Sequence, residues 1–237
     1  MSSLHKWDKS SEGTLYAYWE ARTYTVSFNY NNGTGNTNGV IATYDSAMPT
    51  ISGIPTRTGY IFTGYYDSAN NGTKYYNADL TSAKTWDKTS NTTLYVHWVG
   101  VDYSVRFDGN GSTSGRMDNQ AFVYATAQNL NANRFARTGY TFVGWNAEAD
   151  GNGTSYDNSA SVNNLTTENN GTVVLYAQWK INQYTATFKN FDGEILYSVK
   201  LNYNEIPVYA GETPIKKRTA EFNYIFNGWD KEIVAIF

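Results

Sequence analysis

Hydrophobic and polar residues alternate in short runs along this chain, and one such run occurs three times. Tyr-Thr-Val-Ser-Phe at residues 24–28 returns as Tyr-Ser-Val-Arg-Phe at 103–107 and as Tyr-Thr-Ala-Thr-Phe at 184–188. Each run places an aromatic or aliphatic side chain at every second position, which predicts a β-strand with one buried face. The copies begin about 80 residues apart, and a near-constant interval of this kind indicates a tandem repeat.

A second pattern contains two glycines and follows each copy of the first. Arg-Thr-Gly-Tyr-Ile-Phe-Thr-Gly-Tyr at 57–65 matches Arg-Thr-Gly-Tyr-Thr-Phe-Val-Gly-Trp at 137–145, and a degraded copy, Asn-Tyr-Ile-Phe-Asn-Gly-Trp, lies at 223–229. The first glycine marks a turn that leads into a strand. The glycine within the strand predicts a bulge or a close approach of the backbone to a neighbouring ring.

A third pattern closes the repeat. Leu-Tyr-Val-His-Trp at 94–98 matches Leu-Tyr-Ala-Gln-Trp at 175–179, and Leu-Tyr-Ala-Tyr-Trp is already present at 15–19. We therefore interpret the chain as a series of repeats that begins within the tail of one copy. The predicted divisions are a remnant of a preceding repeat at 1–20, modules at 21–99 and 100–180, and a divergent third module at 181–237 with no clear closing strand.

Other segments predict how each module is built and joined. Alternation lapses at residues 45–48 and 124–128, where a short helical turn would fit. The linkers at 20–23, 100–102 and 180–183 are too short to let neighbouring modules swing freely, so we expect a semi-rigid series.

The recurring aromatic and aliphatic residues are expected to fill the cores of these small modules, because large rings bury much apolar area. The adjacent pairs Tyr65-Tyr66 and Tyr75-Tyr76 differ, since neighbours on a strand face opposite sides and one member of each pair should be exposed. These four tyrosines are candidate contacts for a sugar or a partner protein. The predicted core residues are Tyr24, Val26, Phe28, Tyr60, Phe62, Trp98, Tyr103, Val105, Phe107, Tyr140, Phe142, Trp179, Phe188, Tyr224 and Phe226.

Composition argues against several classes of function. The formal net charge is −3, without the basic stripe that a nucleic-acid partner requires. Cysteine is absent and only His5 and His97 could supply imidazole, which disfavours disulfides, zinc sites and Ser-His-Asp chemistry. No apolar run approaches the ~20 residues of a membrane span, so no membrane insertion is expected. Charged residues make up 16% of the chain and aromatic residues another 16%, a balance typical of extracellular β-proteins. If the protein is exported, we expect its signals outside this sequence.

Candidate chemistry is sparse. Asp-Gly-Asn-Gly at 108–111 and 150–153 resembles part of a calcium loop but lacks the closing glutamate, so turn formation is favoured over a weak calcium site. No nucleophile, base and orienting group occur together, and we expect neither an enzyme nor a cofactor. Lysine and asparagine are plentiful, but the sequence does not place an intramolecular isopeptide bond.

Taken together, these motifs resemble the InlB-type B repeat, also called the Listeria–Bacteroides repeat. The resemblance covers residues 24–98 and 103–179 and, more loosely, 184–229; Ala-Gln-Asn-Leu-Asn-Ala-Asn at 127–133 is a close match. It implies a β-rich α+β fold of small β-grasp-like modules in an elongated array, with no catalytic residues. At 219–222, Thr-Ala-Glu-Phe replaces the usual Arg-Thr-Gly turn, which puts the shape of the third module in question.

The resemblance also implies a location and a role. Such repeats occur in large extracellular proteins of the bacterial cell surface, often between an adhesive domain and the wall anchor. We therefore expect a non-catalytic stalk or spacer that presents an adjoining domain. The alternative is an adhesin-type module that binds a host glycan or protein through exposed tyrosines.

The two ends of the chain suggest an additional partner. Residues 15–19 are a closing strand without a module, and the third module has no clear closing strand. One chain could therefore supply the missing edge of another, which predicts weak head-to-tail self-association. Ile-Val-Ala-Ile-Phe at 233–237 could instead close the third module, and the sequence leaves both options open.

Overall fold

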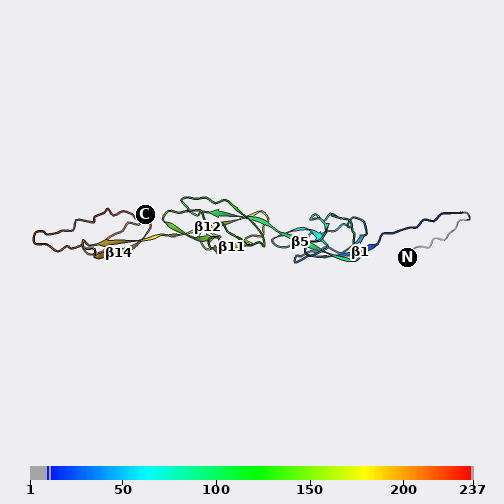
Figure 1. Cartoon of the computed structure of the whole chain (residues 1–237), viewed down its shortest axis with the longest axis horizontal. Coiled ribbons are helices and arrows are strands. Elements are labelled where there is room, and N and C mark those ends of the chain that lie inside the picture. Colours follow the sequence, from blue (N-terminus) through cyan, green and yellow to red (C-terminus); the bar gives the residue numbers. More distant parts are fainter. Residues whose placement is uncertain (1–9, 11, 236–237) are drawn as a thin grey trace. The chain divides into compact units, whose positions relative to one another are not determined.

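The computed structural model describes residues 10 and 12–235. Contacts divide the chain into two compact units, Met1–Val99 and Gly100–Phe237. Figure 1 shows β1 and β5 in the first unit and β11, β12 and β14 in the second. The boundary lies between residues 99 and 100, where the sequence places the end of one module and the start of the next.

The first unit contains a five-stranded sheet in the order β2-β1-β5-β3-β4. β1 pairs with β2 and β3 pairs with β4 as antiparallel neighbours, and β5 lies between β1 and β3, parallel to β1. This parallel register pairs Phe28 with Leu94. The strands are β1 (Thr23–Asn29), β2 (Val40–Thr43), β3 (Tyr60–Tyr66), β4 (Lys74–Tyr76) and β5 (Thr92–Gly100).

The second unit repeats this arrangement in its larger sheet, which has the order β10-β9-β12-β6-β7. Its long central strand β12 is parallel to β6 and antiparallel to β9, and Leu175 is paired with Phe107 as Leu94 is with Phe28. A small sheet of β8 and β11 accompanies it. The strands are β6 (Asp102–Asp108), β7 (Gln120–Val123), β8 (Gln128–Asn129), β9 (Tyr140–Asn146), β10 (Ser155–Tyr156), β11 (Ser161–Val162) and β12 (Gly171–Ile181).

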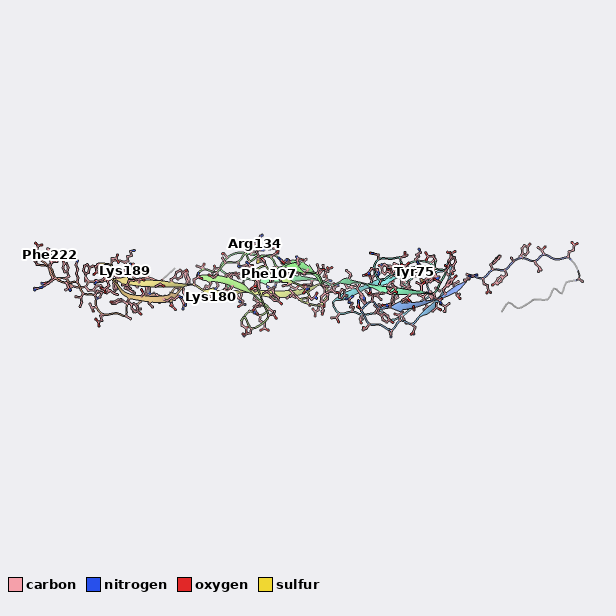
Figure 2. The ribbon with its side chains drawn as sticks, turned by 60° about the horizontal axis from the view of Figure 1, so that its bottom comes forward. Tyr75, Phe107, Arg134, Lys180, Lys189 and Phe222 are labelled. Carbon is pink, nitrogen blue, oxygen red and sulfur yellow. The ribbon has the colours of Figure 1, made fainter. Side chains whose placement is uncertain are left out.

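The second unit ends in a two-stranded ribbon. β13 (Gln183–Lys189) and β14 (Ile195–Asn202) are antiparallel, like β1 and β2 in the first sheet. Residues 203–235 contain turns and bends but no strand. Figure 2 labels Lys189 on this ribbon and Phe222 in the loop that extends from it.

The prediction of an α+β class is wrong. The described residues form strands, turns and bends without a helix, so the chain is all-β with tandem β repeats. The two expected helical turns are tight turns that follow β2 and β7. Asp45 and Ala125 have φ angles of 57° and 63° there, and a positive φ is incompatible with a right-handed helix. It also follows that no helix of the described residues could span a membrane.

The glycine within the second motif allows a close backbone approach, as its position in a strand pattern predicts. Gly64 and Gly144 have φ angles of 135° and 145°. A Cβ atom at Gly64 would lie 2.3 Å from the carbonyl oxygen of Tyr76 on the adjacent strand. The register shifts nearby, between Tyr65 and Tyr66, where the ladder skips Tyr75, so the close approach at Gly64 lies next to a bulge in β4.

Each large sheet covers its own hydrophobic core. The core of the first unit includes Val26, Leu94, Trp86 and Tyr75, the last of which Figure 2 labels within this unit. The core of the second unit is built around Trp145, Leu175 and Phe107, the last of which Figure 2 labels within the sheet. Residues of the opening, glycine-containing and closing strands contribute to both cores and supply most of the buried residues in the second.

Candidate functional site

The predicted core residues fall into three groups. Val26, Phe62, Tyr103, Val105, Phe107 and Phe188 are buried. Partly buried at the margins of the cores are Tyr24, Phe28, Tyr60, Trp98, Tyr140, Phe142 and Trp179. Tyr224 and Phe226 are 38% and 41% exposed, so their assignment to a core is wrong for this structure. Their counterparts in the first two modules pack against a closing strand, whereas no described strand covers them here.

The tyrosines proposed as a ligand surface form no exposed patch. Tyr65, Tyr75 and Tyr76 are fully buried, which overturns the suggestion that they contact a glycan or partner. The Tyr65 hydroxyl lies 2.8 Å from Thr37 Oγ1, and Tyr76 donates to the Pro49 carbonyl at 2.8 Å. Tyr75 and Tyr76 are both buried because the register with β3 skips Tyr75, which forms a bulge in β4, so strand alternation does not hold for this pair.

Tyr66 is the only one of the four that is partly exposed, and it has a ring partner. It stacks on His97 with the centroids 3.8 Å apart and the planes at 9°. His97 Nε2 lies 2.8 Å from the Ser68 carbonyl oxygen, so strand β5 and the loop after β3 are joined at this point. Packing within the module therefore explains the position of the Tyr66 ring.

Burial of these phenols makes the first unit sensitive to alkali. Burial, together with the hydrogen bond to the Asp87 carboxylate, raises the pKa of Tyr75, and burial raises the pKa of Tyr76. Folded protein keeps both protons above pH 10, where unfolded chains release theirs, so stability falls as pH rises beyond that value. We expect a loss of up to about 1.4 kcal/mol per tyrosine between pH 8 and pH 11, measured by urea unfolding. The stability of a Tyr75→Phe/Tyr76→Phe variant should fall less over the same pH range, and an equal fall would contradict this explanation.

Several carboxylates of the described residues serve turns and ion pairs. They form no group of three or more acidic or histidine side chains that could bind a metal ion. Asp150 accepts hydrogen bonds from the backbone and side-chain nitrogens of Asn152 at 3.0 and 2.8 Å, and Asp108 accepts one from the backbone nitrogen of Asn110. The two Asp-Gly-Asn-Gly segments are thus turns closed by their own aspartates.

Lys88 and Asp67 form the best-sheltered ion pair in the first unit, with Nζ and Oδ2 2.7 Å apart. Burial acts to raise the pKa of Asp67, but hydrogen bonds from Lys88 and the Thr73 amide outweigh it and keep that pKa below its ordinary value. The hydrogen bond to Asp67 raises the pKa of Lys88. Each charge therefore stabilises the other, as expected for a salt bridge.

A recurring asparagine connects the opening and closing strands with a loop. The Asn110 side chain donates to the carbonyl oxygens of Ala149 and Ala177 at 2.8 and 2.9 Å. Asn31 makes the equivalent bonds to Ala69 and Val96 at 3.2 and 3.0 Å. Sequence reasoning treated these residues only as turn formers. Asn31 and Asn110 follow their opening strands at the same distance, and this shared position was the sequence signal of a further role.

The closing tryptophan makes a second connection of this kind. Trp179 Nε1 donates to the Gly109 carbonyl at 2.9 Å. Trp98 Nε1 donates to the carbonyls of Tyr30 and Asn31, both at 3.0 Å. A side chain at the end of the closing strand therefore anchors the hairpin turn after the opening strand in both modules.

The junction between β12 and β13 is the closest connection between modules within the second unit. Only Asn182 separates the two strands, and its backbone nitrogen donates to the Gly139 carbonyl at 2.9 Å. Its carbonyl accepts from the Tyr203 amide at 2.9 Å, and its side-chain oxygen accepts from Thr141 Oγ1 at 2.6 Å. The junction thus joins β9, β12 and the β13–β14 ribbon.

Gly139, the glycine of Arg-Thr-Gly-Tyr, is the residue of the second module that contacts this junction. It has a φ of 78°, and a Cβ atom added to it would lie 2.0 Å from the Tyr203 ring. The motif glycine is therefore required both by its backbone conformation and by the aromatic ring that covers it.

A Gly139→Ala substitution should loosen this junction. We expect a cost of about 1–3 kcal/mol from the left-handed backbone, with faster amide hydrogen exchange in residues 183–202. Gly151→Ala is the matched control, because Gly151 has a φ of 83° in an exposed loop away from the junction. Similar exchange in residues 183–202 of both variants would show that the Tyr203 contact is unimportant.

Comparison with known proteins agrees with this repeated architecture. The family described as the Listeria-Bacteroides repeat domain matches residues 24–97 and 103–178. The chain belongs to this family. The resemblance inferred from its motifs is thereby confirmed, and each matched segment runs from the opening strand to the closing strand of one sheet.

Two relatives show which proteins this chain is similar to. A protein of Evansella cellulosilytica named "Putative membrane protein" is 34% identical over 176 residues, which are 73% of this chain and 24% of that protein. Internalin H of Listeria monocytogenes is 33% identical over 130 residues, 54% of this chain and 20% of its own length. The chain thus spans about a quarter or less of these relatives. No solved structure matches it.

Proposed function

We propose that this chain is a non-catalytic repeat region of a bacterial surface protein and that it acts as a stalk or spacer presenting an adjoining domain. Membership of the Listeria-Bacteroides repeat family and the similarity to Internalin H and a protein named as a membrane protein support a surface location. The packed aromatic cores, together with the lack of a metal-binding group among the described residues, support a structural role.

The junction at Asn182 is the observation that favours a spacer over a set of freely hinged modules. A flexible linker would need several residues without fixed contacts. Here one residue connects β12 to β13, and it makes three hydrogen bonds with its surroundings. A connection of this kind resists bending, and resistance to bending is what a spacer requires.

Small-angle scattering of the full chain tests the spacer. One globule of 237 residues would have a radius of gyration of about 18 Å. We expect a clearly larger value, with a maximum dimension that decreases when Gly139→Ala loosens the junction. A value near that of a single globule would contradict the proposal.

The surface location has its own test. Protease treatment of intact producing cells should release peptides from this chain before any cytoplasmic marker appears. Release only after lysis would contradict a surface location and leave the scattering result unaffected.

A further inference from the structure

In both large sheets the first and the last strand of the module lie side by side and run parallel. The chain enters the first module through β1 and leaves it through β5, and residues 26–29 of β1 pair with residues 92–95 of β5. It enters the second module through β6 and leaves it through β12, and residues 103–108 pair with residues 171–176. One ladder of backbone hydrogen bonds therefore joins the entry strand of each module directly to its exit strand.

A parallel pair of this kind responds to tension along the chain differently from a hairpin. Tension pulls β1 back toward its amino end and β5 forward toward its carboxyl end, so the two strands are loaded in opposite directions along their length. The hydrogen bonds between them are then loaded together, in shear. In an antiparallel hairpin pulled at its open end, such as β1 and β2 at Thr23 and Thr43, the bonds break one after another.

Unfolding under tension has to pass through this ladder. β5 lies between β1 and β3, and β12 lies between β6 and β9. The two ends of a module can separate only when the opening or the closing strand leaves the sheet, and either event breaks the ladder between them. Residues 30–91 and 109–170, which lie between these strands in the sequence, carry no tension while the ladder holds.

Two asparagines reinforce the ladder at the end of the opening strand. Asn31 donates to the Val96 carbonyl at 3.0 Å, and Asn110 donates to the Ala177 carbonyl at 2.9 Å. Both acceptors lie on the closing strand, directly after the last residue that pairs with the opening strand. Each bond therefore extends the connection between the two strands beyond the backbone pairs.

The closing tryptophan adds a bond in the opposite direction. Trp98 Nε1 donates to the carbonyls of Tyr30 and Asn31, and Trp179 Nε1 donates to the Gly109 carbonyl. These acceptors belong to the turn that follows the opening strand. The bonds therefore have to break before the closing strand can slide past the opening strand.

The two faces of the ladder contribute in different ways. On the exposed face, hydroxyl pairs connect the strands, with 2.8 Å between the side-chain oxygens of Ser27 and Thr93 and 3.0 Å between those of Ser104 and Thr172. The opposite face is covered by the hydrophobic core of the module. Burial on that face limits the access of water, which would otherwise replace the strained hydrogen bonds.

We propose that each of these two modules bears tension, and that the parallel ladder with its side-chain bonds acts as a clamp between the opening and closing strands. The inference rests on the proposed function, because a spacer between an anchor and a presented domain is the part of a protein that is pulled. It goes further, since a spacer can set a distance without bearing a load. The closing strand suggested for the third module, at residues 233–237, includes Ile236 and Phe237, which lie outside the described residues.

Force spectroscopy on the full chain tests the clamp, because the chain has no cysteine and handles can be attached at chosen positions. Asp102 and Lys180 are exposed and lie at the loaded ends of β6 and β12, so Asp102→Cys with Lys180→Cys loads the ladder in shear. Asp102→Cys with Val123→Cys is the matched geometry. Asp102 is paired with Val123, so tension between these positions peels β7 from β6.

The two geometries should differ in opening force and in step length. In shear, the second module should open in one step of roughly 250 Å, the extended length of about 80 residues less their folded distance. In the peeling geometry the first step should be roughly 70 Å and should occur at a clearly lower force. Equal opening forces in the two geometries would overturn the clamp and leave the scattering and protease tests of the spacer unaffected.

Asn110→Gly tests the side-chain reinforcement. Glycine keeps the φ of 45° but removes the bond to Ala177, so the lifetime of the second module at constant force in shear should fall about fivefold, the effect of one lost hydrogen bond. Asn170→Gly is the matched control and should leave this lifetime unchanged, because Asn170 has a φ of 60° and an exposed side chain.

The peeling geometry shows whether Asn110 acts through the clamp or through general stability. Its side chain is bonded to β12 and to the loop after β9, so Asn110→Gly should not change the first peeling step, in which β7 leaves β6. An equal change in both geometries, or no change in shear, would contradict the role of Asn110 in the clamp.

Discussion

Replacement of Trp145 by alanine should destabilise the second unit by about 3–5 kcal/mol. Trp145 is fully buried, and its ring contacts those of Phe107, Phe135 and Phe142, with centroids 4.9 to 6.3 Å apart. Alanine would leave a cavity shared by three aromatic side chains, and a rigid sheet can close only part of it. Hydrogen exchange followed by mass spectrometry should show faster exchange in β6, β9 and β12, with β1 and β5 unchanged.

Trp145→Phe is the control for this substitution. The indole nitrogen of Trp145 is buried without a hydrogen-bond partner, so its removal leaves no protein group unsatisfied. Phenylalanine should therefore cost much less than alanine. If the two variants were equally unstable, loss of ring packing would not be the cause.

Replacement of Asn110 by alanine should destabilise the same unit by about 2–4 kcal/mol, of which about 1 kcal/mol comes from each lost hydrogen bond. The side chain donates to Ala149 in the loop after β9 and to Ala177 in β12, and the residue has a φ of 45° that alanine adopts poorly. Urea unfolding measures the total change. Exchange in residues 147–154 should increase most, because the loop loses its attachment to β12.

Asn110→Gly separates the two causes. Glycine accepts the positive φ without strain but supplies no amide, so it should recover only the backbone part of the loss. Full recovery with glycine would mean that the side-chain bonds contribute little. The same substitutions at Asn31 should act on the first unit, where the asparagine has a φ of 46° and makes the equivalent bonds.

Most strand positions were predictable because they depend on local alternation repeated at a fixed interval. The three opening strands lie close to where the sequence places them, as do the glycine-containing and closing strands of the first two modules, whereas residues 15–19 and 223–229 form no strand. The turns were also predictable, because Asn and Gly adopt positive φ angles at low conformational energy and therefore mark turns in the sequence. These features need no information about distant parts of the chain.

The burial of Tyr65, Tyr75 and Tyr76 could not be predicted in this way. Alternation assigns adjacent residues to opposite faces, but Tyr75 is a bulge residue in β4, and it and Tyr76 both join the same core as Trp86 and Met48. The expected helix failed for a related reason. Residues 44–59 connect β2 to β3 through turns and isolated bridges that depend on Thr34 and Trp86, which lie elsewhere in the sequence.

The sequence by itself determined that this chain is a series of β-modules of the Listeria-Bacteroides repeat family, because side-chain period and repeat interval are properties of the linear chain. Only the tertiary structure decided which strands are neighbours and where the asparagine and tryptophan bonds connect them. Those features depend on packing between segments that are about 20–70 residues apart, and such contacts arise from shape and burial in three dimensions, not from local pattern.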